Sequence, residues 1–315
     1  MNTPAGESPS TRNAPFSKDR TITVSIVICT LNRPDALRNC LAAIALLDPA
    51  PDDLLIVDNT AGEDATKALA LEFGARYTIE PVRGLSRARN RGLSESSSEI
   101  VAFLDDDAIA DPHWLGGVVA PFTDPSVAAA AGKIRTPDSG TKEPAAENVR
   151  VLSNKDPRWF EIATFGGMGL GSNMALRKEA CAGRRIFDER LGRGAPFQIA
   201  EESYAFAVLL SLGYKAVYVP DAIVFHPPMR RSSIEQEARN SVSYWFLLFS
   251  EFSDHRLDLL RFLIRRLLRM PLTWPRDPQG PGEIINSSWR VKWGAAVSGA
   301  LHFLRTPKPP DKYLK

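Results

Sequence analysis

Short apolar runs alternate with amphipathic stretches over the first third of the chain. The run Thr21–Cys29 is rich in β-branched residues, and shorter apolar runs follow at Leu54–Val57 and Glu99–Leu104. Such runs are typical of strands buried on both faces of a parallel sheet. Residues 63–74 have a helical pattern and end at a glycine, a common helix stop. The alternation predicts a doubly wound α/β fold with a mostly parallel sheet.

The rest of the chain has a less regular pattern. Residues 133–160 are polar and rich in proline, which predicts a long loop. A helix is expected over 203–211, and a strand over Lys215–Val219 that Pro220 closes. From Ile234 to Met270 the chain is expected to be helical and is both apolar and basic.

The composition excludes several classes of protein. The 315 residues are 44% hydrophobic and 24% charged, which is typical of a globular protein rather than a disordered or collagen-like one. Three cysteines without metal-ligand spacing exclude a disulfide framework or a zinc ribbon, and they fit a reducing compartment. The sequence has no run of 18 apolar residues, so no transmembrane helix is predicted. The first 20 residues are polar and lack the apolar core of a secretory signal.

The net charge of +2 hides an asymmetry between two parts of the chain. Residues 1–228 carry a balance of −5, whereas residues 229–315 carry 15 Lys and Arg against 8 Asp and Glu, a balance of +7. A basic tail indicates an anionic partner, either nucleic acid or a membrane surface. The aliphatic character of this tail argues against nucleic acid.

Polar side chains follow three successive predicted strands. They are Thr30, Asn32 and Arg33 after the first strand, Asp58 after the second, and Asp105-Asp106-Asp107 after the third. In sheets of this kind, ligands bind beyond the carboxyl ends of the strands. Adjacent carboxylates repel one another unless a cation lies between them, and oxygen ligands select hard ions such as Mg²⁺ or Mn²⁺. The triple aspartate therefore predicts a phosphate-binding metal site, with a solvated acidic turn as the alternative.

Four further features have both a functional and a structural interpretation. Asp58 suits hydrogen bonds to a nucleotide base or sugar, or else a turn cap. The basic segment Gly84–Gly92 suits a diphosphate, or else an exposed helix. Glu201 and Glu202 open a predicted helix, where one carboxylate suits a general base, although both also favour the helix dipole. His226 suits a metal ligand or a structural histidine at a strand end.

Seven motifs occur in order between Val24 and Pro227, about two thirds of the chain. They are SIVICTLNRPDALRNCL, LLIVDNT, GLSRARNRGL, VAFLDDDA, GLGSNMALRKEA, FDERLGRGAPF and EESYAFAVLLSLGYKAVYVPDAIVFH. Together they resemble the motifs of the family-2 glycosyltransferases, which have the GT-A type nucleotide-sugar-binding fold. The resemblance implies transfer of a sugar from a nucleotide-diphosphate donor to an acceptor hydroxyl. It also implies inversion at the anomeric carbon and assistance by Mg²⁺ or Mn²⁺.

The resemblance assigns roles to individual residues. The second member of the family's Glu-Asp pair is the base, and it corresponds here to Glu202, with Glu201 before it. Asp105 and Asp107 correspond to the D-x-D metal motif, and His226 to a histidine that often follows. The residues expected at the donor are Thr30, Asn32, Arg33, Asp58, Arg83, Arg89, Asn90, Asp105 and Asp106. Glu202 is one methylene longer than the family's aspartate, which changes the reach of the base.

With this resemblance the chain divides into three parts. Residues 1–20 are expected to form a disordered leader, and residues 21–228 a GT-A catalytic domain. Within that domain, residues 21–107 form the nucleotide-binding half and residues 108–228 the acceptor half. Residues 229–315 form a basic amphipathic helical region.

One segment of the tail, Leu257–Met270, has an amphipathic helical pattern, and residues 256–270 are the stretch expected to meet an anionic membrane surface. On a helical wheel its charged side chains fall within one arc of about 140°, and most aliphatic side chains cover the other side, with Phe262 as the exception. The charged residues are Asp258, Arg261, Arg265, Arg266 and Arg269. The pattern indicates either an interfacial helix on an anionic membrane or a helix packed on the catalytic domain. The aromatic residues interpreted as core or interfacial anchors are Trp245, Phe246, Phe249, Phe252 and Trp274.

The sequence therefore predicts a glycosyltransferase that builds a cell-envelope or extracellular polysaccharide or glycolipid. The acceptor is expected to be a saccharide or a polyprenyl-linked sugar. The expected location is cytoplasmic, with peripheral attachment to the inner face of the cell membrane as an option. Two alternatives are a catalytically impaired sugar-nucleotide-binding protein, which Glu202 would explain, and a nucleotidyltransferase on a related fold. The latter would need a glycine-rich basic loop where the chain has Thr30–Asp35.

Overall fold

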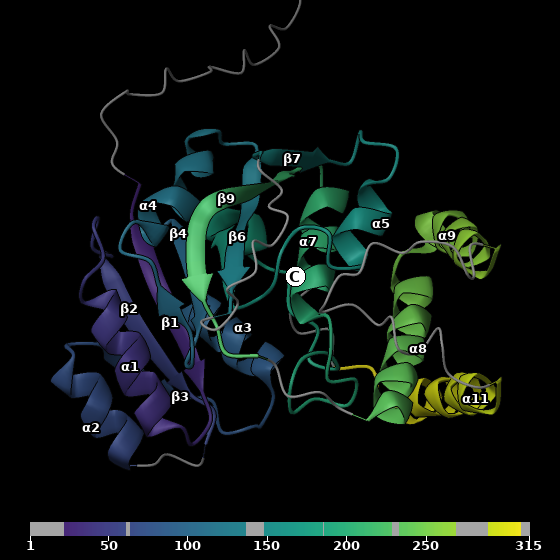
Figure 1. Cartoon of the computed structure of the whole chain (residues 1–315), viewed down its shortest axis with the longest axis horizontal. Coiled ribbons are helices and arrows are strands. Elements are labelled where there is room, and N and C mark those ends of the chain that lie inside the picture. Colours follow the sequence, from purple (N-terminus) through teal and green to yellow (C-terminus); the bar gives the residue numbers. More distant parts are fainter. Residues whose placement is uncertain are drawn as a thin grey trace, which may run out of the picture.

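A nine-stranded mixed sheet forms the centre of the molecule (Figure 1). The structure is a computed structural model that describes residues 22–60, 64–136, 148–184, 186–228, 233–268 and 289–309. The predicted leader, together with Arg269, Met270 and Trp274, lies outside these described residues.

The N-terminal half supplies four parallel strands and three helices. The strands are β1 (Val24–Thr30), β2 (Asp53–Asp58), β3 (Arg76–Ile79) and β4 (Ile100–Asp105). The helices are α1 (Pro34–Ile44), α2 (Asp64–Glu72) and α3 (Leu85–Glu95). Alternate residues of β1 face opposite sides of the sheet, so Ile26 packs in the core with α1 and Val27 in the core with α3. Gly92 brings α3 close to β1, because a Cβ there would lie 2.4 Å from a methyl of Val27.

The second half completes the sheet and adds shorter helices. Its strands are β5 (Ile109–Ala110), β6 (Val127–Arg135), β7 (Arg150–Ser153), β8 (Asn173–Arg177) and β9 (Lys215–Phe225). Its helices are α4 (Trp114–Val119), η1 (Ala120–Thr123), α5 (Trp159–Thr164), α6 (Lys178–Cys181) and α7 (Glu201–Ser211). The strand order is β3-β2-β1-β4-β8-β6-β9-β5, with β7 paired to β9. Six strands point in one direction and only β5, β7 and β8 in the other, so the mostly parallel sheet is confirmed.

Two predictions for this half were wrong. The loop expected over 133–160 contains the end of β6, all of β7 and the start of α5. The strand expected to stop at Pro220 continues to Phe225. Pairing between β6 and β9 shifts at this point, from Gly132 opposite Val219 to Lys133 opposite Ile223. Pro220 therefore lies in an irregularity of the ladder, where its missing N–H breaks no regular pair.

The C-terminal region forms helices beside the sheet domain. They are α8 (Ile234–Glu251), η2 (Ser253–His255), α9 (Arg256–Leu268) and α11 (Trp289–Arg305). The helical stretch expected from Ile234 to Met270 is thus interrupted at Phe252, where the backbone leaves the helical conformation. No helix in the described part of the chain is long and apolar enough to cross a bilayer.

The exception on the helical wheel, Phe262, packs against aromatic residues outside its own helix. Phe262 is buried and stacks on Phe165, with ring centroids 4.3 Å apart, and on Trp245 at 5.7 Å. Aromatic partners outside the helix therefore decide which face packs inward, and these partners are not part of the helix's own periodicity.

Candidate active site

The carboxyl ends of the parallel strands bring the predicted polar residues to one edge of the sheet. Thr30 of β1 pairs in register with Asp58 of β2, and Asp105 of β4 pairs with the residue before Thr30. His226 follows β9, which runs in the same direction as these strands. The strand-end arrangement expected from the sequence is therefore present.

Three of these residues form a group that could hold a metal ion. Asp105, Asp107 and His226 each offer a ligand atom, and these atoms lie within 4.8 Å of one another. His226 Nε2 is 3.0 Å from an Asp107 oxygen and 3.6 Å from an Asp105 oxygen. Its Nδ1 donates to the carbonyl of Pro227 at 2.6 Å, which orients Nε2 toward the carboxylates. Two carboxylates and an imidazole suit Mn²⁺ and also allow Mg²⁺, so the residues present fit a divalent cation.

Opposite charges in this group shift the pKa values of its members. Burial alone would lower the pKa of His226, but its interactions with Asp105 and Asp107 outweigh burial and raise that pKa to about 10. Burial would raise the pKa of Asp107, but His226 and Arg33 hold it well below its usual range. Asp107 is therefore a carboxylate throughout the neutral range and is available as a ligand.

Asp106 has a different environment from the two aspartates beside it. It is buried and accepts hydrogen bonds from Thr30 Oγ1 and from the guanidinium of Arg33, both at 2.7 Å. Burial raises the pKa of Asp106 to about 6 despite these donors. Arg33 also donates to Asp107, so it ties the acidic turn to the end of β1. Contacts of Thr30, Arg33 and Asp106 with a donor remain predictions, as does that of Asn32, an exposed residue with a left-handed φ of 52°.

The other expected donor residues are engaged in different ways. Asp58 is fully buried and accepts hydrogen bonds from the backbone of Thr60 at 2.9 Å and the hydroxyl of Tyr77 at 2.7 Å. Asn90 donates to the backbone of Phe187 at 2.8 Å. Arg83 is exposed, and its side chain lies beside Gly194. Their roles toward a nucleotide remain predictions.

Arg89 connects the metal group to the carboxylate pair. Its guanidinium is only 2% exposed and donates to Glu201 Oε1 at 2.7 Å, Asp105 Oδ1 at 3.2 Å and the carbonyl of Gly171 at 3.0 Å. It therefore joins the start of α7 to the end of β4 and leaves little of its surface for a diphosphate. This geometry suits a positioning residue better than a donor contact.

We expect Arg89→Met to destabilise the protein by about 3–5 kcal/mol, because removing one partner leaves buried carboxylates uncompensated. The matched control is Arg91→Met on the same helix, where an exposed ion pair with Glu95 is worth about 0.3–0.5 kcal/mol. Urea unfolding of both variants measures the difference. Equal loss of stability in the two variants would show that the buried network contributes no more than the exposed ion pair.

Glu202 lies next to this network but is not part of it. Its side chain is partly buried, and no hydrogen bond to it from another side chain is seen among the described residues. Burial and the neighbouring Glu201 raise the pKa of Glu202 to about 8. The buried Tyr244 of α8 also lies within electrostatic range of Glu202, and its hydroxyl donates to the carbonyl of Thr164 at 3.2 Å. Sequence reasoning missed Tyr244, since nothing local links α8 to the start of α7.

The segment before the carboxylate pair is strained and held from outside. Gln198 and Ala200 have positive φ angles of 55° and 63°, which non-glycine residues rarely adopt. Phe197 packs against His302 of α11, whose Nε2 donates to the carbonyl of Pro196 at 2.8 Å. The C-terminal helices thus contact the loop that delivers Glu202.

The fold and the acidic site at its strand ends together define an α/β protein of the GT-A type. The family model described as glycosyl transferase family 2 matches residues 25–183, about half of the chain. The chain belongs to glycosyl transferase family 2, which is a family of transferase enzymes. Glu201, Glu202 and His226 lie beyond the matched residues.

The relatives of this chain include proteins named as glycosyltransferases and as a polysaccharide biosynthesis protein. The succinoglycan biosynthesis protein ExoM of Rhizobium meliloti is 29% identical over 230 residues, 69% of this chain and 71% of that protein. Glycosyltransferase AglE of Haloferax volcanii is 25% identical over 214 residues, 65% of this chain and 66% of that protein. The O-antigen chain rhamnosyltransferase RfbN of Salmonella typhimurium is 25% identical over 210 residues, again 66% of its length. The chain thus spans about two thirds of these relatives.

Solved structures share the fold at low sequence identity. S. aureus TarS 1-349 superposes with a TM-score of 0.59 at 15% identity, covering 88% of this chain and 81% of TarS. The mannosyltransferase PcManGT from Pyrobaculum calidifontis, solved with GDP-Man and Mn²⁺, superposes with a TM-score of 0.52 at 18% identity. The second match covers 92% of this chain and 77% of PcManGT. These structures confirm the expected fold class, and the family model confirms the expected family.

Proposed function

We propose that this chain transfers a sugar, with inversion, from a nucleotide-diphosphate donor to a hydroxyl of a saccharide or polyprenyl-linked acceptor. The observation that supports it best is the Asp105–Asp107–His226 group joined through Arg89 to the carboxylate pair of α7. The first part suits a divalent cation and a diphosphate, and the second supplies a carboxylate for an acceptor hydroxyl. Family membership and the Mn²⁺ complex of PcManGT support the same proposal.

In the proposed reaction the acceptor oxygen attacks the anomeric carbon on the face opposite the leaving group. The bond from that carbon to the diphosphate oxygen breaks, and the hydroxyl proton passes to Glu202. Glu201 stays bound to Arg89 and holds the first turn of α7 in place. A bound cation supplies positive charge for the departing nucleoside diphosphate. One displacement without a covalent intermediate inverts the configuration.

The names of relatives suggest the biological setting. They include a succinoglycan biosynthesis protein, an O-antigen chain rhamnosyltransferase and a glucosyl-dolichyl phosphate glucuronosyltransferase. We extend from them the proposal that this chain builds a cell-envelope or extracellular glycan on the cytoplasmic side of the membrane.

A thermal-shift screen of nucleotide diphosphates and their sugars, with and without Mn²⁺, tests the proposed donor class. A ligand of the native state raises the unfolding temperature as its concentration exceeds Kd. We expect one nucleotide to stabilise the protein in the presence of Mn²⁺. The corresponding nucleotide sugar should then donate its sugar to a lipid-linked or free saccharide. NMR of the product should show an inverted anomeric configuration. If no nucleotide diphosphate stabilises the protein, the proposal is overturned.

The raised pKa of Glu202 predicts opposite pH trends for activity and stability. A base must be deprotonated, so transfer should rise with pH and level off above about 8. The folded state holds this proton more tightly than the unfolded chain, where the pKa is about 4.5, so folding stability is lost as pH rises from 4.5 to 8.

Glu202→Gln removes this titration. We expect the variant to match the parent at pH 5 and to exceed it at pH 9 by on the order of 2 kcal/mol, a few degrees in unfolding temperature. Calorimetry at the two pH values measures the change. A variant that is less stable than the parent at pH 9 would contradict the inference that the charged form of Glu202 destabilises the fold.

A further inference from the structure

Exposed large apolar side chains are concentrated in the C-terminal helices. Of 17 such side chains in the described part of the chain, eight lie in α8, α9 and α11, although these helices and their flanks hold 57 of the 249 described residues. The eight are Phe246, Phe249, Leu257, Leu260, Ile264, Val297, Leu301 and Leu304. We call them the C-terminal apolar surface. A set of this density indicates a partner rather than the scattered apolar residues of an ordinary surface.

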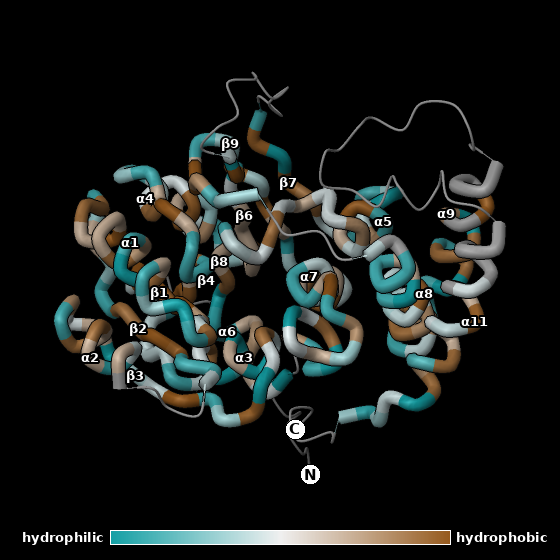
Figure 2. Tube along the Cα trace, turned by 60° about the horizontal axis from the view of Figure 1, so that its bottom comes forward, coloured by the Kyte–Doolittle hydropathy of each residue, from teal (hydrophilic) through white to brown (hydrophobic). Residues whose placement is uncertain are grey.

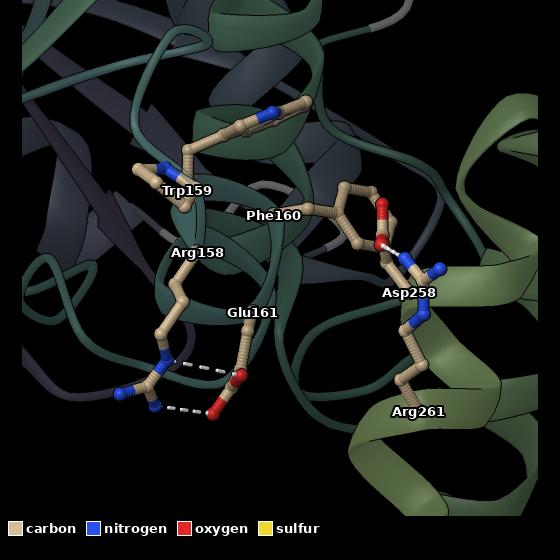
Figure 3. A pocket seen from close by; sticks show the side chains of 7 residues that line it. Arg158, Trp159, Phe160, Glu161, Asp258 and Arg261 are labelled. Atoms are coloured by element: carbon tan, nitrogen blue, oxygen red, sulfur yellow. Dashed lines mark hydrogen bonds and ion pairs between the residues drawn. The ribbon is translucent and has the colours of Figure 1, made fainter.

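Packing of α9 fixes which of its residues face outward. Leu259 and Phe262 are buried, and Phe262 stacks on Phe165 after α5. Figure 3 shows the adjoining cleft, of about 110 Å³, where Phe160 of α5 faces the Asp258–Arg261 pair of α9. Leu257, Leu260 and Ile264 are 65%, 48% and 45% exposed. These three residues therefore have no place in the core of the described chain.

Packing of α11 has the same consequence. Gly299 contacts α8 so closely that a Cβ there would lie 2.5 Å from Val242, and its carbonyl accepts a hydrogen bond from Ser243 at 3.1 Å. Val297, Leu301 and Leu304 follow one another at helical spacing and are exposed. Both views place α8, α9 and α11 at the end of the molecule farthest from α2, and Figure 1 shows α9 and α11 at opposite ends of α8 (Figures 1 and 2).

The charge of both helices indicates what covers this surface. Helix α9 contains four arginines and one aspartate, and α11 contains two arginines, one lysine and no acidic residue. Helix α8 contains one arginine and three glutamates, so the three helices together have a net charge of +4. A second copy of the chain would bring like charges together, and nucleic acid offers no partner for leucine and isoleucine. Anionic lipid headgroups attract each basic residue near the surface by about 1 kcal/mol, and the acyl boundary accepts the apolar side chains.

We propose that the C-terminal apolar surface docks on an anionic lipid bilayer. The inner side of α11 contacts the loop before Glu202 through His302 and Phe303, so docking holds the catalytic pair at a fixed position relative to the lipid. This last step rests on the proposed function, because it serves an acceptor with a lipid anchor. Docking itself requires neither donor nor acceptor.

Co-sedimentation of the full chain with vesicles tests the docking. We expect binding to vesicles of phosphatidylcholine with phosphatidylglycerol, weaker binding at high salt, and little binding to phosphatidylcholine alone. The variant Leu257→Gln, Leu260→Gln, Ile264→Gln should bind at least about tenfold more weakly, since burying each leucine is worth about 1.5–3 kcal/mol and tenfold equals 1.4 kcal/mol.

The matched control replaces three leucines of similar exposure outside this surface, Leu46→Gln, Leu71→Gln and Leu212→Gln. It should bind like the parent, and thermal unfolding checks that all variants fold. A second variant, Leu301→Gln with Leu304→Gln, tests α11 separately. Equal binding of the α9 variant and the parent would overturn the proposal. A parent protein that does not bind anionic vesicles would also overturn it. The same holds if the parent does not bind vesicles but forms a dimer, and the α9 variant is monomeric. The assay contains no sugar donor, so its failure is distinguishable from failure of the transfer reaction.

Discussion

Asp107→Asn is expected to reduce divalent-dependent sugar transfer by about 10³-fold or more. The change removes one of two carboxylates in the candidate metal group and leaves the shape of the side chain intact. A cation that stabilises the departing diphosphate contributes several kcal/mol, and each 1.36 kcal/mol is tenfold in rate. Initial rates over a Mn²⁺ titration, together with Mn²⁺-dependent binding of the nucleotide diphosphate, measure the effect.

The control for this change is Asp53→Asn. Asp53 also pairs with an arginine, Arg76 at 2.6 Å, but it lies at the opposite end of β2 from Asp58. Its variant should lose stability without losing the response to Mn²⁺. An Asp107→Asn protein with unchanged Mn²⁺ dependence would remove this aspartate from the metal site, whatever its turnover.

Glu202→Gln is expected to lower the turnover number by about 10²-fold or more, the lower end of what loss of a general base costs. The amide keeps the size of the side chain but cannot accept the hydroxyl proton. Donor affinity should change little, because the proposed base contacts the acceptor. Steady-state kinetics with varied donor and acceptor separate the two effects.

Glu201→Gln is the comparison that decides the order of the pair. Glu201 accepts a hydrogen bond from Arg89, so its amide variant should weaken the network and lower stability. Turnover should fall less than in Glu202→Gln. If the Glu201 variant instead loses most turnover and the Glu202 variant is nearly normal, the two roles are exchanged.

The strand-end site could be predicted because its evidence is local. The run before Asp105 is apolar enough to be recognised as a buried strand, and the carboxyl ends of parallel strands share one edge. Motif order then added Glu202 and His226, which are about 100 and 120 residues further along the chain. These distant residues reach the site through β9 and α7, whose existence was expected but whose pairing was not.

The roles of neighbouring arginines could not be predicted from spacing. Arg87, Arg89 and Arg91 look equivalent in the sequence, yet only Arg89 is buried, whereas Arg87 pairs with Glu189 and Arg91 with Glu95. Which arginine is buried depends on the packing of α3 against β1 and on contacts with α7, which comes later in the sequence. The same reason explains Phe262, whose partners belong to other elements.

The contact between His302 and Pro196 joins segments that are 106 residues apart. It has a consequence for the exchange of parts between relatives. A chimaera that keeps residues 1–228 and takes its C-terminal helices from another protein would inherit the catalytic residues but not the support of their loop. The strained backbone at Gln198 and Ala200 would then be free to relax. We therefore expect residues 1–228 and the C-terminal helices to be exchanged between relatives together rather than separately.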